Sequence, residues 1–202
     1  MDIYFLMIYK KKKLKIKDLK AKIFLAMFFL LAFGDTFHVG FRITAYLQND
    51  FSPLLGYGSL ATAITITLFY GLFAILWKIR FKKEKTYLLY FMFLLLMLRL
   101  LIFLPANNHW EFAKPPRDWS IYRNLPLIIF GLILAPLMLK DAKKENDKTF
   151  EYFSYAISLS YICFIPVVFF ASEFPLIGLL MIPKTIIYLL MLIIGYKEFF
   201  AK

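Results

Sequence analysis

Residues 87–104 read YLLYFMFLLLMLRLLIFL, an apolar run interrupted by a single charge, Arg99, near its end. A helix needs about 20 mostly apolar residues to cross the hydrocarbon core of a bilayer. A strand of a soluble protein is usually far shorter than this run. The stretch therefore predicts a transmembrane helix, and the rest of the chain can be interpreted outward from it.

Five further apolar segments lie on either side of this run, and the chain as a whole is 61% hydrophobic. Together they predict an all-α membrane protein, a bundle of about six transmembrane helices that leaves no room for a soluble domain. The expected spans form one domain, 23–198, and the fourth is the shortest: 23–46, 59–77, 87–104, 125–139, 152–171 and 176–196. Residues 1–22 form a basic segment ahead of this domain. The many Phe residues are expected to face lipid.

The positive charges are distributed unevenly about these spans. Nineteen of the 25 Lys and Arg residues precede the first span, follow the second and fourth, or lie in the C-terminal tail. Because such residues gather in cytoplasmic loops, both termini are expected in the cytoplasm. The net charge of +12 is explained in this way without a nucleic-acid partner. The composition, rich in Lys, Ile and Phe, suggests a multi-pass protein of a bacterial inner or plasma membrane.

The first span contains the most unusual polar pattern. Residues 29–47 read FLLAFGDTFHVGFRITAYL, and place Asp35, His38 and Arg42 at spacings of three and four. On a helix these three side chains share one face. A central Asp or Arg exposed to lipid costs about 2.5–3.5 kcal/mol on insertion scales. This face is therefore expected to point into the bundle or into a water-filled cavity.

Two charges on other spans lie at a similar depth, Arg99 on the third and Lys184 on the sixth. Above them the segment 107–124 is expected to form an ordered outer loop that covers the site. We therefore expect one polar cluster that opens outward, with an excess of cations over carboxylates that favours an anionic ligand. The predicted ligand-binding residues are Asp35, His38, Arg42, Arg99, His109, Arg123, Asn124 and Lys184.

The first functional hypothesis is a protein that binds a small anionic or amphipathic ligand in this pocket, either as a transporter or as its substrate-binding subunit. In size and number of spans the chain resembles the substrate-capturing subunits of energy-coupling-factor vitamin transporters, although no motif carries the resemblance. An alternative is a membrane enzyme that acts on a lipid-like substrate, with Asp35 or His38 as the acid–base group. A third is a structural or signalling subunit. The expected partners are membrane lipids, the small anionic ligand and another membrane protein.

Metal and cofactor chemistry find little support in the sequence. The chain has two histidines, His38 and His109, and a single cysteine, Cys163. A protein zinc site needs three or four ligands, and the cations near Asp35 disfavour a marginal site there. No nucleotide-binding motif is present. We therefore expect neither a metal nor a cofactor.

Overall fold

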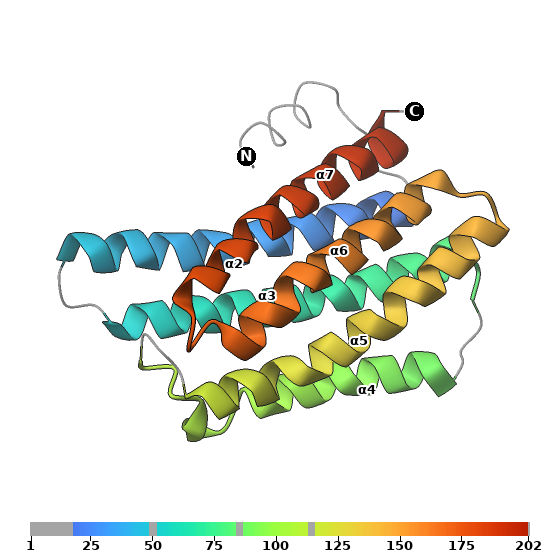
Figure 1. Ribbon diagram of the computed structural model, residues 1–202. Coiled ribbons are helices and arrows are strands. Elements are labelled where there is room, and N and C mark those ends of the chain that lie inside the picture. The colour runs from blue at the N-terminus through green and yellow to red at the C-terminus, as the bar shows by residue number, and fades with distance from the viewer. Residues whose placement is uncertain (1–17, 49–51, 84–86, 113–115, 202) are drawn as a thin grey trace.

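The computed structural model describes residues 18–48, 52–83, 87–112 and 116–201 (Figure 1). All regular elements of these residues are helices. In chain order they are α2 (Leu19–Gln48), α3 (Ser52–Arg80), α4 (Tyr87–Ile102), the short 3-10 helix η1 (Ala106–Asn108), α5 (Arg117–Lys144), α6 (Lys148–Phe170), the 3-10 helix η2 (Pro175–Leu180) and α7 (Met181–Phe200).

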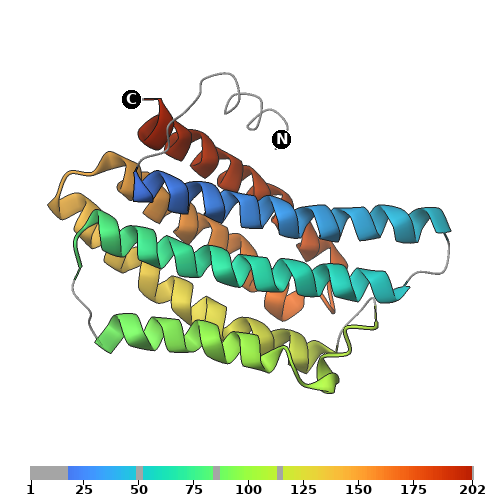
Figure 2. The same cartoon turned by 180° about the vertical axis from the view of Figure 1, so that it is seen from behind.

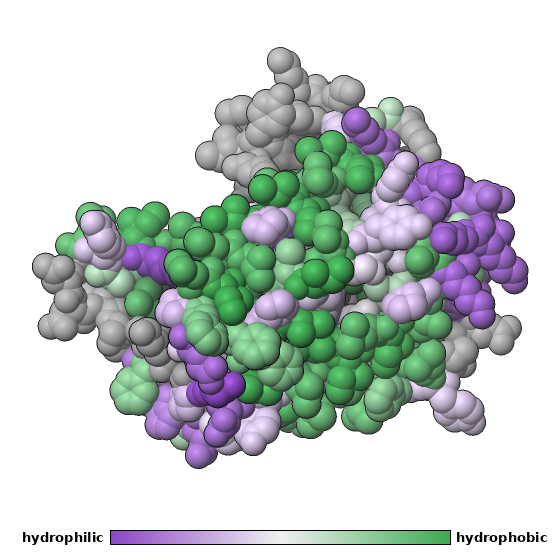
Figure 3. All heavy atoms as spheres, in the orientation of Figure 1, coloured by the Kyte–Doolittle hydropathy of each residue, from purple (hydrophilic) through white to green (hydrophobic). Residues whose placement is uncertain are grey.

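Five of the described helical stretches are long and apolar enough to cross a membrane. They are Leu19–Leu47, Leu54–Arg80, Arg117–Lys144, Lys148–Phe170 and Pro175–Phe200, with α4 as a shorter apolar helix. On the face shown in Figure 3, an apolar band separates two more polar ends. The prediction of an all-α, multi-pass membrane bundle is thereby confirmed, whereas the orientation of the termini stays a prediction.

The helices run up and down, so that their ends gather at two opposite ends of the bundle (Figures 1 and 2). We call the end where α3 finishes and α6 begins the basic end, and the end that carries η1 and η2 the loop end. Helix α2 packs along α3, and α5 packs against both α4 and α6. Helix α7 packs against α6 and crosses α2. The short connections explain why neighbours in sequence are also neighbours in space.

The core is unusually rich in aromatic rings, which corrects the expectation that the Phe residues face lipid for one part of them, whereas others such as Phe29 and Phe33 are exposed. Phe24, Phe69, Phe73, Phe130, Phe150 and Phe153 have no exposed surface. Two glycines make room for rings, because a Cβ at Gly195 would collide with the Phe24 ring and one at Gly131 with the Tyr161 ring. Without a hydrophobic driving force between helices in lipid, such close packing is what holds the helices together.

The expected outer loop at 107–124 is shorter than predicted, since α5 already begins at Arg117. Pro116 stands at its N-cap, where a residue without an N–H group costs no helical hydrogen bond. Hydropathy missed this first part of the helix because its polar residues, among them Asp118 and Arg123, resemble a loop. The shortest of the six apolar helices is α4, whereas the sequence predicted the fourth span to be the shortest.

Candidate functional site

Asp35 is positioned by a close approach of α2 to α3. Gly34 is buried at this contact, and a Cβ there would collide with the Thr65 hydroxyl. The Thr62 hydroxyl donates a hydrogen bond to the Gly34 carbonyl, with 3.1 Å between the oxygens. The Asp35 carboxylate itself lies on the exposed side of α2. The close contact of α2 with α3 at Gly34 thus sets the position of the neighbouring Asp35 along the bundle.

Lys184 is buried in the first turn of α7 and is 8% exposed. Its ammonium nitrogen lies 4.2 Å from the centre of the Phe164 ring and 5.7 Å from that of Tyr188. Among the described residues no carboxylate lies within ion-pair distance of this nitrogen and none of them accepts a hydrogen bond from it. Asp35 and Arg99 both lie near enough to act on it electrostatically. Among the described residues, the amine therefore contacts aromatic faces and has only the more distant Asp35 as an opposite charge.

Arg99 on α4 is 2% exposed and is bonded to neutral groups. Its Nε donates to the Arg123 carbonyl at 2.9 Å, and its Nη1 to the Thr67 hydroxyl at 2.7 Å. Its Nη2 donates to the Asn124 side-chain oxygen at 3.0 Å. The guanidinium also lies 5.3 Å from the Phe103 ring centre. One arginine thus links α4 to α3 and α5, with no carboxylate of the described chain at ion-pair distance.

Arg123 extends this cluster toward the loop end. Its guanidinium carbon lies 4.3 Å from the centre of the Trp110 ring, a cation–π geometry. Trp110 is anchored in turn, because its indole donates to the Phe103 carbonyl at 3.0 Å. The Arg123 Nη1 atom is buried and has no hydrogen-bond partner among the described residues. This nitrogen is a donor that a ligand or a water molecule could use.

A chain of hydroxyl groups lies next to these cations and was not predicted from the sequence. Tyr70 and Tyr188 bring their hydroxyl oxygens within 2.9 Å, and Ser160 donates to Tyr188 at 3.2 Å. The Tyr161 hydroxyl donates to the Leu127 carbonyl at 2.8 Å. These hydroxyls lie near enough to Arg99 to act on it electrostatically. The only sequence signal was the position of three tyrosines inside apolar spans instead of at their ends.

The structure joins three of the predicted site residues by hydrogen bonds, Arg99, Arg123 and Asn124. Lys184 and the exposed Asp35 are linked to them by electrostatic influence only. We call these five residues the interior cluster. His38, Arg42 and His109 are not joined to it by any hydrogen bond or ion pair of the described residues. His38 is half-buried with an unpaired Nδ1 atom, and Arg42 is exposed. No group of three or more His, Cys, Asp or Glu side chains among the described residues could hold a metal ion.

His109 lies in the connection between η1 and α5, away from these charges. Its Nδ1 lies 2.8 Å from Glu111 Oε1, and its ring stacks on Phe112. The hydrogen bond to His109 holds the pKa of the Glu111 carboxyl below its usual value. Nearby, Arg117 forms an ion pair with Glu173, which ties the start of α5 to the end of α6.

Comparison with protein-family models, curated proteins and solved structures gave no match.

A second polar group occupies the basic end and differs from the interior cluster in its pairing. Arg80 binds Asp147 at 2.7 Å and Glu198 at 3.0 Å. Asp141 accepts hydrogen bonds from Lys83 at 2.6 Å and from the Trp77 indole at 3.0 Å. We call these six residues the basic-end network. Every carboxylate in it has a cation, and together they join α3 to α5, α6 and α7.

Proposed function

We propose that this protein binds a small anionic or amphipathic ligand in the membrane, at a site built around Lys184. The main support for this site is the burial of the Lys184 amine and its lack of a polar partner in the described part of the chain. The amine is buried, it touches aromatic rings, and it has neither a carboxylate nor a hydrogen-bond acceptor among the described residues. A buried charge is costly unless it is paired and hydrogen-bonded. A ligand with a negative group would supply the missing partner.

The charge balance of the interior cluster supports the same choice of ligand. Arg99, Arg123 and Lys184 are buried cations, and Asp35 is the one carboxylate of the cluster. Ionisable residues inside a membrane usually mark a ligand or ion pathway. An excess of two positive charges favours a carboxylate, sulfate or phosphate group, because each can accept several charge-assisted hydrogen bonds. The unpaired Nη1 atom of Arg123 is one donor for it.

The outer surfaces of α7 and α2 near Lys184 favour a ligand with an apolar body. Ile182 and Ile186 are exposed two residues before and after Lys184, on another face of α7, and on α2 Phe33 and Phe37 are exposed as well. In a membrane these surfaces face hydrocarbon, so an amphipathic molecule could keep its apolar part in the bilayer. Asp35, exposed on the same helix as the two phenylalanines, would orient the polar part by repelling its negative group.

The three buried cations would have different tasks. Arg99 already uses three of its donor directions on Thr67, Arg123 and Asn124, so it is best suited to hold the helices in place. Lys184 has no such bonds and is best suited to touch the ligand. For Arg99 alone, this division supports the hypothesis of a structural subunit, in which buried polar residues serve only to join helices. We call this the assembly hypothesis.

Mass spectrometry of the molecules that co-purify with the protein tests this proposal. We compare the wild type with Lys184→Met, which keeps the side-chain length, and with Lys140→Met, an exposed lysine of α5. We expect one anionic species to be retained by the wild type and by Lys140→Met, and to be lost from Lys184→Met. Identical species on all three folded proteins would contradict the proposal and favour the assembly hypothesis.

A further inference from the structure

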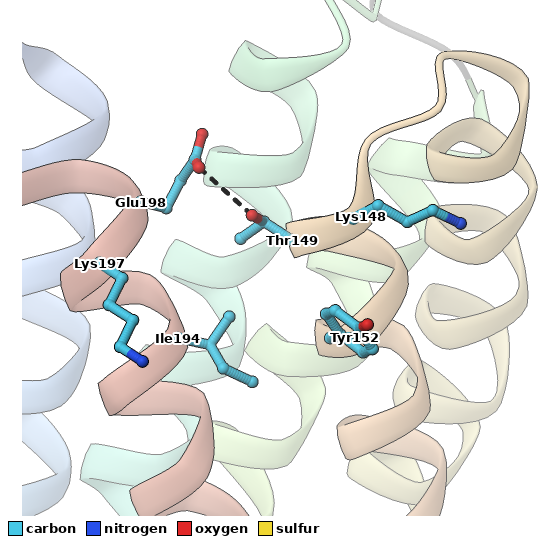
Figure 4. Close-up of a pocket in the computed structure, with 6 residues that line it drawn as sticks. All are labelled: Lys148, Thr149, Tyr152, Ile194, Lys197 and Glu198. Carbon is cyan, nitrogen blue, oxygen red and sulfur yellow. Dashed lines mark hydrogen bonds between the residues drawn. The ribbon is translucent and has the colours of Figure 1, made fainter. Parts of the chain in front are cut away.

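A groove opens at the basic end, between the beginning of α6 and the end of α7 (Figure 4). It has a volume of about 270 Å³. Ile194 lies between the two helices, and Lys197 follows on α7. A hydrogen bond of 3.3 Å from the Thr149 hydroxyl to Glu198 closes one side of the groove. The lining residues are Lys148, Thr149, Tyr152, Ile194, Lys197 and Glu198.

The residues that line this groove carry one excess positive charge, because Lys148 and Lys197 stand against the single carboxylate of Glu198. Glu198 is bound by Arg80 at 3.0 Å, a cation that it shares with Asp147. Lys148 pairs with Glu151 at 2.9 Å, but its side chain is 74% exposed, and such surface pairs are weak. The exposed Lys197 has no carboxylate within ion-pair distance among the described residues. An anion near the groove would therefore meet a cation that has no internal partner.

The groove lies where the apolar surfaces of α6 and α7 give way to the polar basic end. Farther along α7, toward the loop end, Leu190 and Ile193 are exposed, and Leu159 is exposed on α6. Tyr152 is 56% exposed at the rim, as is typical of tyrosines at the boundary between lipid and water. A cationic groove directly above an apolar surface matches a molecule with a charged head and hydrocarbon chains.

We infer that this groove binds the headgroup of an anionic phospholipid from the leaflet at the basic end. The phosphate lies beside the Lys197 ammonium, and the acyl chains run along the exposed apolar faces of α6 and α7. Binding pockets for whole small molecules hold roughly 300–1,000 Å³, so this groove accommodates a headgroup but not the chains. Basic pockets between transmembrane helices are known to take such headgroups. The site is independent of Lys184 and of the function proposed above.

Native mass spectrometry of the full chain in detergent micelles tests this inference. The micelles are titrated with phosphatidylglycerol or, separately, with zwitterionic phosphatidylcholine. Lys197→Gln removes the unpartnered charge, and Lys140→Gln removes an exposed charge at the same end outside the groove. One basic residue at an anionic surface contributes about fivefold in affinity. We expect a phosphatidylglycerol-selective site that is weakened about fivefold by Lys197→Gln and unchanged by Lys140→Gln.

A second variant tests the groove rather than the charge. Ile194→Trp fills the space between α6 and α7 and leaves the net charge unchanged, so it should abolish selective binding in a protein with an unaltered melting temperature. Inorganic phosphate at millimolar concentration should not displace the lipid, because it lacks the chains. Equal weakening by the two lysine variants, equal binding of the two lipids, retention by Ile194→Trp, or displacement by phosphate would each overturn the inference.

Discussion

The basic-end network and the interior cluster contain similar residues but pair them differently. At the basic end, Arg80 and Lys83 reach three carboxylates that come from α5, from the turn before α6 and from α7. In the interior cluster, the contacts of Arg99 with described residues are those with neutral oxygens and the Phe103 ring, and those of Lys184 are with aromatic rings. The first arrangement gives every carboxylate a cation, with Arg80 shared between two of the three. The second leaves positive charge uncompensated in the part of the protein where charge is most costly.

The basic-end network joins helices by ion pairs and Arg99 joins them by hydrogen bonds to neutral groups, whereas Lys184 makes neither kind of contact with the described residues. Paired carboxylates and cations that join four helices act as a clamp at the basic end. An unpartnered buried amine adds little to the clamping of helices, because cation–π contacts are modest compared with the cost of removing the charge from water. Three variants, ordered by the size of their expected effect, test the comparison, and a fourth tests an exposed pair outside both groups.

Arg99→Ala should have the largest effect. It leaves a cavity among buried side chains and removes the donors for Thr67, Asn124 and the Arg123 carbonyl. We expect the free energy of unfolding to fall by about 3–5 kcal/mol, measured by denaturant titration in detergent micelles. Arg99→Met, which fills most of the space, should lose less. The exposed Arg42→Ala is the control. An equally small loss at both arginines would show that Arg99 is not a structural link.

Arg80→Ala should have the next largest effect. It deprives Asp147 and Glu198 of their cation at a site where the arginine side chain is 27% exposed. Because water partly screens this site, we expect a loss of about 2 kcal/mol in the free energy of unfolding. Lys140→Ala at the same end should change it little. A loss as small as that of the control would mean that the basic-end network does not clamp the helices.

Lys184→Met should change stability by no more than about 1 kcal/mol, because a methionine of similar length removes a buried charge that has no internal partner. The same thermal or denaturant measurement without added ligand checks this expectation. A loss comparable to that of Arg99→Ala would place Lys184 among the structural residues. It would thereby remove the main support for the proposed ligand site.

The smallest effect concerns the exposed pair of His109 and Glu111. Since hydrogen bonding to His109 lowers the Glu111 pKa in the folded protein, the pair stabilises the fold above the ordinary pKa of a glutamate. That contribution is lost as the pH falls through the lowered value. His109→Asn, which tolerates the left-handed backbone of this position, should raise the Glu111 pKa in a carboxyl NMR titration. An unchanged pKa would contradict the assignment.

The fold class could be predicted from the sequence, because six apolar runs leave few alternative folds for a chain of this length. The sequence also made Asp35, Arg99 and Lys184 candidates for a site, since a charge within an apolar run is conspicuous whatever its neighbours, and this role stays a prediction. It did not identify Tyr70 and Tyr188, whose amphipathic side chains are as common at membrane interfaces as in cores. The ion pair of Arg80 with Glu198 could not be predicted from the sequence either. Residues so distant in sequence meet only through the packing of α3 on α6 and α7.

The hydrogen bonds of Arg99 have a consequence for the biosynthesis of the protein. Helix α3, which supplies Thr67, is made before α4, whereas the Arg123 carbonyl and Asn124 belong to α5 and are made afterwards. When α4 leaves the ribosome, its arginine can therefore find one of its three partners but not the other two. Helix α4 is apolar enough to insert by itself, since its many leucines outweigh one arginine near its end. We therefore expect it to take its final place in the bundle only when α5 lies beside it and supplies the two missing acceptors.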